Sequence, residues 1–181
     1  MTDLSDVEID ETLPEVVQEF LRNGGELETI TLHANGRWSH EGGWVENQKV
    51  SRLFSKSVAR TQGGTWVLKI WRFTYPITVE DTGFFIEHVD LFGDTPSMTL
   101  SDETHEDLDS STLRYEGDGF LTCRVKDGAF RARFLRQPYY KLMQRVEERD
   151  GVIALPIGGE VVALAYLDDR PVGDPAADSD F

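Results

Sequence analysis

Cysteine is nearly absent from this 181-residue chain, in which Cys123 is the only one. No disulfide can form within the chain, which fits a reducing compartment, and the alternating pattern of residues 119–125 makes Cys123 a small core residue. The sequence also has no basic, apolar leader and no uninterrupted apolar run of membrane-spanning length. We therefore expect a cytoplasmic protein without membrane contacts, whose oligomeric state the sequence does not indicate.

Basic residues are scarce, since 18 lysines and arginines stand against 33 aspartates and glutamates, for a formal net charge of -15 at pH 7. Proteins that bind nucleic acids draw affinity from basic residues that release counterions from the phosphates. The charge therefore argues against nucleic acid as a partner.

Recognisable catalytic motifs are missing as well: the chain has no nucleophile elbow, phosphate-binding loop or dinucleotide fingerprint. The four histidines have no metal-ligand spacing, although His33 and His40 could face each other across a hairpin. Glu80 and Asp81 are adjacent, so in a strand they point to opposite faces and are not expected to act together. We expect no cofactor, no metal and no enzymatic activity.

What the chain does contain is an alternation of hairpins, amphipathic helices and apolar strands. Apolar residues at helical spacing predict helices at 12–24, 47–60 and 138–149, and Thr12 with Glu15 forms the pattern of a capping box. Asn35-Gly36 and Lys126-Asp127-Gly128 predict hairpin turns. Further strands are predicted at 65–71, 73–79, 84–91, 152–156 and 161–167.

This pattern predicts an α+β fold of two units, each with mainly antiparallel sheet and a packed helix. We place the N-terminal unit at 12–90 and the C-terminal unit at 91–172, with disordered acidic tails at 1–11 and 173–181. The polar, acidic segment 101–119 is predicted to be a long exposed connection with little regular structure, although its charge could equally form an interaction surface.

The two units repeat one order of features: a turn glycine, an aromatic residue, an amphipathic helix, a glycine break and an apolar strand. Gly36 and Trp38 correspond to Gly128 and Phe130 at an offset of 92. This predicts an internal duplication, with coincidence between common runs of elements as the alternative.

The same residues resemble a bacterial family known as domain of unknown function 1285. The similarity rests on ordered motifs that run from about Thr29 to Leu164, including Asn35-Gly36-Arg37-Trp38, Tyr75-Pro76-Ile77-Thr78-Val79-Glu80-Asp81, Asp127-Gly128-Ala129-Phe130 and Arg136-Gln137-Pro138-Tyr139. The resemblance implies two related α+β units, the second like a pleckstrin-homology barrel. It also implies a nucleotide-like ligand between the units and a role in signal transduction, but no catalytic residues.

Basic residues gather on the two predicted units, which carry 14 of the 18 lysines and arginines in the two stretches 49–72 and 124–149. Arginines from both units could converge on a phosphate or carboxylate, with aromatic rings beside them. The alternative is that these basic residues are solvated or covered by acidic segments of the chain. The predicted ligand-binding residues lie at strand ends beside aromatic rings: Arg37, Trp38, Arg72, Arg131, Arg133, Arg136 and Tyr139.

We therefore expect a non-catalytic small-ligand-binding or sensor protein that holds a small, nucleotide-like anion between its two units. The alternative is a protein-interaction adaptor that uses the acidic segment 101–119 and an aromatic surface. An enzyme of unknown type ranks last, because no catalytic motif is present.

Overall fold

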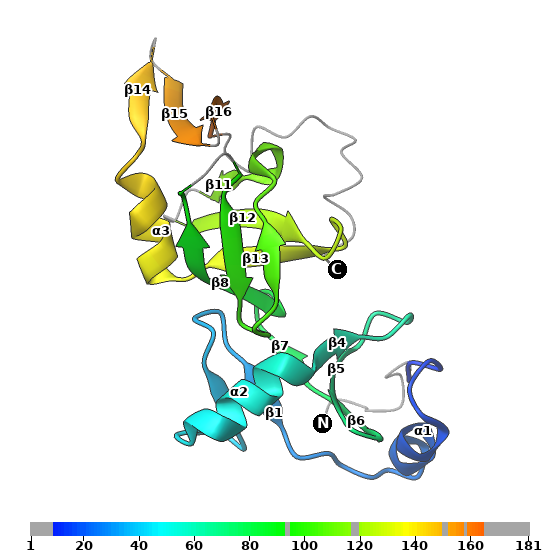
Figure 1. Cartoon of the computed structure of the whole chain (residues 1–181). Coiled ribbons are helices and arrows are strands. Elements are labelled where there is room, and N and C mark those ends of the chain that lie inside the picture. The colour runs from blue at the N-terminus through cyan, green and yellow to red at the C-terminus, as the bar shows by residue number, and fades with distance from the viewer. Residues whose placement is uncertain (1–8, 93–94, 117–119, 150–151, 158, 165–181) are drawn as a thin grey trace. The chain divides into compact units, whose positions relative to one another are not determined.

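The computed structural model describes residues 9–92, 95–116, 120–149, 152–157 and 159–164, which form several mainly antiparallel sheets and a few short helices (Figure 1). The predicted α+β class is confirmed. The chain divides into two compact units, Met1–Gly83 and Phe84–Phe181. We predicted the boundary between residues 90 and 91. It lies earlier, between Gly83 and Phe84, because residues 84–90 pair with strands of the second unit. No helix among the described residues is long and apolar enough to span a membrane.

The first unit contains two small sheets. One has the strand order β3-β2-β1-β7 and the other the order β4-β5-β6; all pairings are antiparallel except that of β1 with β7. Its elements are α1 (Glu15–Arg22), β1 (Ile30–Leu32), β2 (Trp38–His40), β3 (Gly43–Trp44), α2 (Gln48–Ser57), β4 (Val58–Arg60), β5 (Trp66–Ile70), β6 (Phe73–Pro76) and β7 (Thr78–Val79).

Local sequence explains most of these elements. Gly36 has a φ of 79°, which the β1–β2 turn requires and which glycine adopts without strain. Asn47 caps α2, since its side-chain oxygen accepts hydrogen bonds from the backbone N–H groups of Lys49 and Val50. The predicted capping box of α1 is wrong: Pro14 occupies the N-cap and the Thr12 hydroxyl donates to Asp10 instead.

The start of the described chain is tied to the rest of the first unit. Asp10 accepts a hydrogen bond from the hydroxyl of Thr61, and Thr12 accepts one from the backbone N–H of Gly63. The hydrogen bonds that Asp10 accepts from the hydroxyls of Thr12 and Thr61 draw its pKa below the usual value, the bond from Thr12 most of all. Residues 9–11 are therefore ordered, whereas the remainder of the predicted N-terminal tail and all of the C-terminal tail lie outside the described residues.

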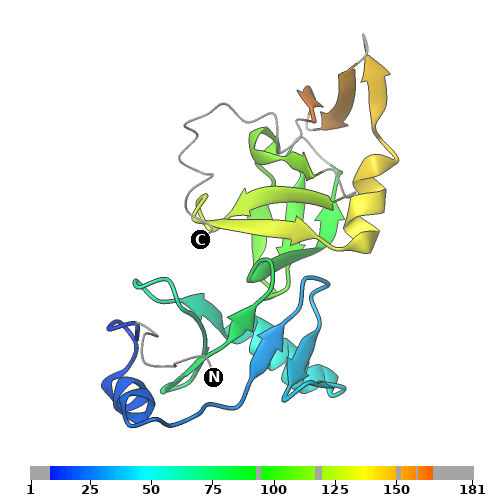
Figure 2. The same ribbon diagram turned by 180° about the vertical axis from the view of Figure 1, so that it is seen from behind.

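The second unit is built on a six-stranded sheet with the order β10-β9-β8-β13-β12-β11, and a separate three-stranded sheet has the order β14-β15-β16 (Figure 2). Its elements are β8 (Phe84–Asp90), β9 (Ser97–Leu100), β10 (His105–Asp107), a 3-10 helix (Ser110–Thr112), β11 (Arg114–Glu116), β12 (Phe120–Val125), β13 (Phe130–Phe134), α3 (Arg136–Met143), β14 (Glu147–Arg149), β15 (Val152–Ile157) and β16 (Glu160–Ala163).

The predicted pleckstrin-homology-like barrel is not formed by the described residues. The six-stranded sheet is open, with β10 at one edge and β11 at the other, and these two strands are not paired with each other. The structure therefore confirms the predicted two-unit α+β fold but not a barrel in the second unit.

Two local predictions in the second unit are wrong. The segment 101–119 is not a connection without regular structure, because it contains β10, the 3-10 helix and β11, which add to both edges of the sheet. The third helix ends at Met143, before residues 147–149 form β14. Pairing with β15 outweighs the helical spacing of Val146, which is a tertiary effect that local pattern does not contain.

The element order of the two units is similar, while their sheets differ. In each unit a hairpin is followed by a helix and a three-stranded antiparallel meander, β4-β5-β6 or β14-β15-β16. The hairpin strand β1, however, pairs in parallel with β7, which follows its helix, whereas β13 pairs in parallel with β8, which precedes its hairpin. The duplication therefore stays a prediction.

Candidate functional site

Two of the three predicted ligand-binding residues in the first unit are exposed and one is buried. Trp38 is only 2% exposed, and its indole N–H donates to the hydroxyl of Ser55 at 3.0 Å. Its ring packs edge-on against Phe54 at 5.3 Å, so Trp38 is a core residue and not a stacking platform for a ligand. Arg37 precedes β2, and Arg72 lies in the turn between β5 and β6.

The four predicted residues of the second unit divide between two faces of its sheet. Arg131 and Arg133 lie on β13, where their side chains alternate with the buried Ala132 and Phe134. Tyr139 interacts instead with Tyr115, which lies opposite the buried Leu121 on the core side of the sheet.

The other two predicted residues, Arg136 and Tyr139, lie on α3 and have other neighbours than the arginines of β13. Burial raises the pKa of Tyr139 above its usual value, and the hydrogen bond with Tyr115 raises it further. Arg136 is exposed at the start of α3, with its guanidinium 5.6 Å from the centre of the Tyr140 ring. The prediction that Arg131, Arg133, Arg136 and Tyr139 line one site is therefore wrong for Tyr139, which packs on the opposite face of the sheet.

A cluster of three arginines lies on one side of strands β12 and β13. Arg124 is directly opposite Arg131, and Arg133 is opposite Thr122, so these side chains share one face. The other face of both strands is buried and apolar. We call Arg124, Arg131 and Arg133 the arginine face.

Two neighbours hold the arginine face in place. Arg131 Nη1 donates to the carboxylate of Glu116 on β11 at 3.0 Å, and both side chains are about four-fifths buried. The guanidinium of Arg133 lies 3.3 Å from the centre of the Phe120 ring, which is a close cation–π contact. Like charges directly opposite each other in a sheet are destabilising, and the Glu116 carboxylate offsets this repulsion between Arg124 and Arg131.

A groove with a volume of about 680 Å³ adjoins this face through Arg124. It is lined by residues of both charges, among them the carboxylates of Glu106, Asp107 and Asp109 and the ammonium group of Lys126. Among the described residues no group of three or more histidine, cysteine, aspartate or glutamate side chains is placed to hold a metal ion. The lining carboxylates make this groove less suited to an anion than the arginine face itself.

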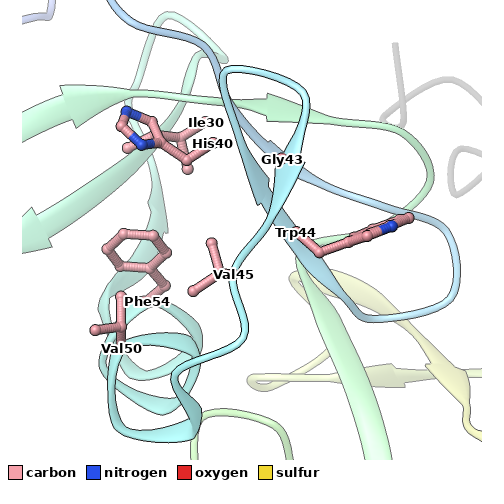
Figure 3. Close-up of a pocket in the computed structure, with 7 residues that line it drawn as sticks. All are labelled: Ile30, His40, Gly43, Trp44, Val45, Val50 and Phe54. Atoms are coloured by element: carbon pink, nitrogen blue, oxygen red, sulfur yellow. The ribbon is translucent and has the colours of Figure 1, made fainter.

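The first unit contains an apolar cavity of about 410 Å³ between α2 and the β1–β3 strands (Figure 3). Figure 3 shows Phe54 and Val50 on one side, Ile30 and His40 on the other, and the Trp44 side chain directed away from this group. Nε2 of His40, which lines the cavity, lies 2.7 Å from the carboxylate of Glu28. None of the predicted ligand-binding residues lines this cavity.

Trp44 lines the cavity and also contacts a cluster of polar side chains that the sequence patterns did not reveal. Its ring, 45% exposed, contacts the guanidinium of Arg37 at 4.1 Å and the imidazole of His33 at 4.8 Å. His33 in turn contacts Ser39 and Glu80. The hairpin register around Asn35-Gly36 predicts that residues 33 and 39 are close, but nothing in the local pattern links them to Glu80, 47 residues further along the chain.

The fold and these sites define a two-unit α+β protein with an arginine face in one unit and an apolar cavity in the other. Among solved structures, the chain is similar to a DUF1285 family protein from Silicibacter pomeroyi DSS-3, with a TM-score of 0.57 and 20% sequence identity over 77% of this chain and 80% of that chain. It is also similar to a DUF1285 family protein from Shewanella baltica OS155, with a TM-score of 0.51 and 16% identity over 65% of this chain and 92% of that chain.

The chain therefore has the fold of DUF1285 family proteins, as the sequence resemblance implied. No family model and no curated protein matches it. At these identities the likeness concerns the fold alone, and the function has to be argued from this chain's own residues.

Proposed function

We propose that this protein is a small-ligand-binding or sensor protein and that the arginine face of its second unit binds the anionic group of the ligand. The observation that carries the proposal is the direct opposition of Arg124 and Arg131, with Arg133 on the same face of the sheet. Positive charges concentrated in this way, in a chain of net charge -15, favour a negatively charged ligand.

The geometry suits a phosphate or carboxylate group. Guanidinium groups donate two parallel hydrogen bonds to such groups, which gives both affinity and orientation. The Phe120 ring restricts the Arg133 side chain before any ligand arrives, so less conformational entropy is lost on binding. A nucleotide-like ligand between the units and a role in signal transduction remain predictions from the family resemblance. The buried, unpaired thiol of Cys123 supports the predicted cytoplasmic location.

A thermal-shift screen against nucleotides and phosphorylated metabolites tests the proposal. A ligand that binds only the folded state at 100 times its Kd stabilises that state by about 2.7 kcal/mol, which raises the melting temperature measurably. We expect the double variant Arg131→Gln/Arg133→Gln to lose this shift. The control Arg22→Gln/Arg145→Gln removes the same charge from two exposed arginines outside the arginine face and outside the predicted ligand-binding residues, and should keep it.

Calorimetric titration of both double variants with the best compound of the screen gives the decisive comparison. Equal affinities in the arginine-face variant and the control would remove Arg131 and Arg133 from the site. A chain that responds to none of the compounds would favour the alternative function.

That alternative, a protein-interaction adaptor, is favoured by one observation in the first unit. Trp71, in the turn between β5 and β6, is 95% exposed and has a left-handed φ of 54°, and Phe73, the first residue of β6, is 60% exposed. A large side chain in this backbone conformation is unusual and costs about 1 kcal/mol or more. A purified partner that binds the wild type but not Trp71→Ser/Phe73→Ser would support the adaptor, and equal binding would contradict it.

A further inference from the structure

The first unit contains a hydrogen-bonded relay of serine, histidine and glutamate. The hydroxyl of Ser39 lies 2.7 Å from Nε2 of His33, and Nδ1 of His33 lies 2.8 Å from Oε1 of Glu80. The second oxygen of Glu80 accepts a hydrogen bond from the backbone N–H of Ala34 at 3.0 Å. A nucleophile bonded to a base, which is in turn oriented by a third group, is the arrangement that activates serine in acyl transfer.

Strand pairing brings these three residues together. The β1–β2 turn places residue 39 opposite residue 31, so His33 and Ser39 project from the same face of the hairpin. The parallel pair of β1 with β7 aligns Leu32 with Val79, and the next residues along each chain are His33 and Glu80. Three elements separated in sequence therefore fix the relay.

The hydrogen bonds of Glu80 determine which nitrogen of the His33 ring carries the proton. The N–H of Ala34 lowers the pKa of Glu80 below its usual value, and His33 lowers it further, although burial opposes both. The carboxylate is therefore ionised and can only accept, which places the imidazole proton on Nδ1. With the ring neutral and its proton on Nδ1, Nε2 accepts the hydrogen bond that the Ser39 hydroxyl donates.

Two further side chains on this face complete the surroundings. Trp44 is opposite Ser39 in the β2–β3 register, and its ring packs on His33. The guanidinium of Arg37, which directly precedes β2 and lies two residues before Ser39, is 4.1 Å from the centre of the Trp44 ring. A cation and an aromatic ring thus accompany the nucleophile. Ser39 is 6% exposed, His33 about a quarter exposed and Glu80 nearly half exposed, so a substrate reaches the hydroxyl from the His33 side.

We propose that Ser39 is a nucleophile that accepts an acyl group from a small, negatively charged ester, with His33 as its general base and Arg37 as the residue that attracts the anionic substrate. This activity departs from the expectation of a non-catalytic protein and is independent of the arginine face, which lies in the other unit. Glu80 is a positioning residue, since it acts through His33.

The step balances within the named groups. Ser39 Oγ attacks the ester carbonyl carbon as its proton moves to Nε2 of His33, and the bond from the carbonyl carbon to the leaving alcohol then breaks. The leaving alkoxide takes the proton from His33, which leaves an acyl-serine and a neutral imidazole. Water then attacks the acyl carbon as its proton moves to Nε2, the bond from this carbon to Ser39 Oγ breaks, Oγ takes the proton back from Nε2, and the carboxylic acid leaves.

Mono-p-nitrophenyl succinate, an anionic activated ester, is the probe that tests this proposal, with neutral p-nitrophenyl acetate as its comparison. We expect release of p-nitrophenolate in a burst of up to one equivalent and an acyl group on Ser39 in peptide mass spectra. His33→Gln should react about 100-fold more slowly, which is the low end of a general base's contribution. Arg37→Gln should remove the preference for the anionic ester.

Glu80→Gln should lower the first-order rate constant of acylation and leave both the burst amplitude and the half-saturating ester concentration unchanged, whereas loss of folded protein would lower the amplitude. Ser51→Ala is the matched control, because Ser51 donates to the carbonyl of Val45 outside the relay and its loss should leave acylation unchanged.

Ser39→Ala should lose both the burst and the acyl group, and a second variant covers the case in which Ser39→Ala fails to fold. Ser39→Cys keeps a side chain of similar size, and its thiol should react with iodoacetamide faster than the same thiol in Ser39→Cys/His33→Gln. The native Cys123 is buried and does not compete. Absence of acylation at Ser39 in the wild type, or equal thiol reactivity with and without His33, would overturn the proposal.

Discussion

Trp38 provides a quantitative test of the core of the first unit. Its indole donates a 3.0 Å hydrogen bond to Ser55 and packs edge-on against Phe54, both on α2. Because the side chain is almost fully buried, loss of either partner leaves a defect inside the unit. The informative set of variants is Trp38→Phe, Ser55→Ala and the double variant.

The structure sets the expected magnitudes. Ser55→Ala leaves a buried N–H without its partner, which costs about 1–3 kcal/mol. Trp38→Phe removes the hydrogen bond and part of a buried ring, at about 2–3 kcal/mol, less than the 3–5 kcal/mol typical of truncation to alanine. Either change breaks the same hydrogen bond, so the double variant should be about 1 kcal/mol more stable than the sum of the single effects predicts.

The assay uses a feature of the composition. All four tryptophans, at positions 38, 44, 66 and 71, belong to the first unit, so tryptophan fluorescence during urea unfolding reports on that unit. Additive effects within about 0.3 kcal/mol would refute the shared hydrogen bond. An anion affinity of Trp38→Phe below that of the wild type would refute its assignment to the core.

Two further predictions concern the second unit. Lys126 forms ion pairs of 2.7 Å with Asp102 and 3.1 Å with Glu106, so Lys126→Met should cost about 1–3 kcal/mol in thermal unfolding, and Lys49→Met, on the exposed side of α2, should cost far less. Burial opposes both charges, but the mutual hydrogen bonds lower the pKa of Asp102 and raise that of Lys126. The contribution of Asp102 is therefore present above its usual pKa of 3.8 and lost as pH falls through the lowered value, while that of Lys126 is present below its usual 10.5 and lost as pH rises through the raised value. The difference between wild type and Lys126→Met should be largest between these limits; a difference independent of pH would contradict the pairing. Burial raises the pKa of the Cys123 thiol to about 12, so iodoacetamide at pH 8 should modify it only in denaturant, and rapid modification of the native chain would contradict its burial.

Local chemistry predicted the elements that depend on neighbouring residues. The Asn35-Gly36 and Lys126-Asp127-Gly128 turns, the start of α2 near residue 47 and strands β12 and β13 all follow from patterns a few residues long. Arg131 and Arg133 could also be predicted to share a face, because residues two apart in a strand do so.

The remaining features depend on contacts between distant residues. Trp38 beside Arg37 suggested a ligand platform, yet packing against α2 buries its ring. The opposition of Arg124 and Arg131 follows from the hairpin register, but the contact of Arg131 with Glu116 needs a third strand. Glu80 reaches His33 only through a parallel strand pair, and such pairs carry no short-range sequence signal.

The central claim, that the arginine face binds an anion, is tested most directly through Glu116. In the ligand-free protein its carboxylate occupies Arg131, so an incoming anion has to compete with it. Calorimetric titration with pyrophosphate should show binding to Glu116→Gln about threefold to fivefold tighter than to the wild type, which corresponds to the ~1 kcal/mol upper value for a partly exposed ion pair. Unchanged or weaker binding by a folded Glu116→Gln would contradict an anion site at the arginine face.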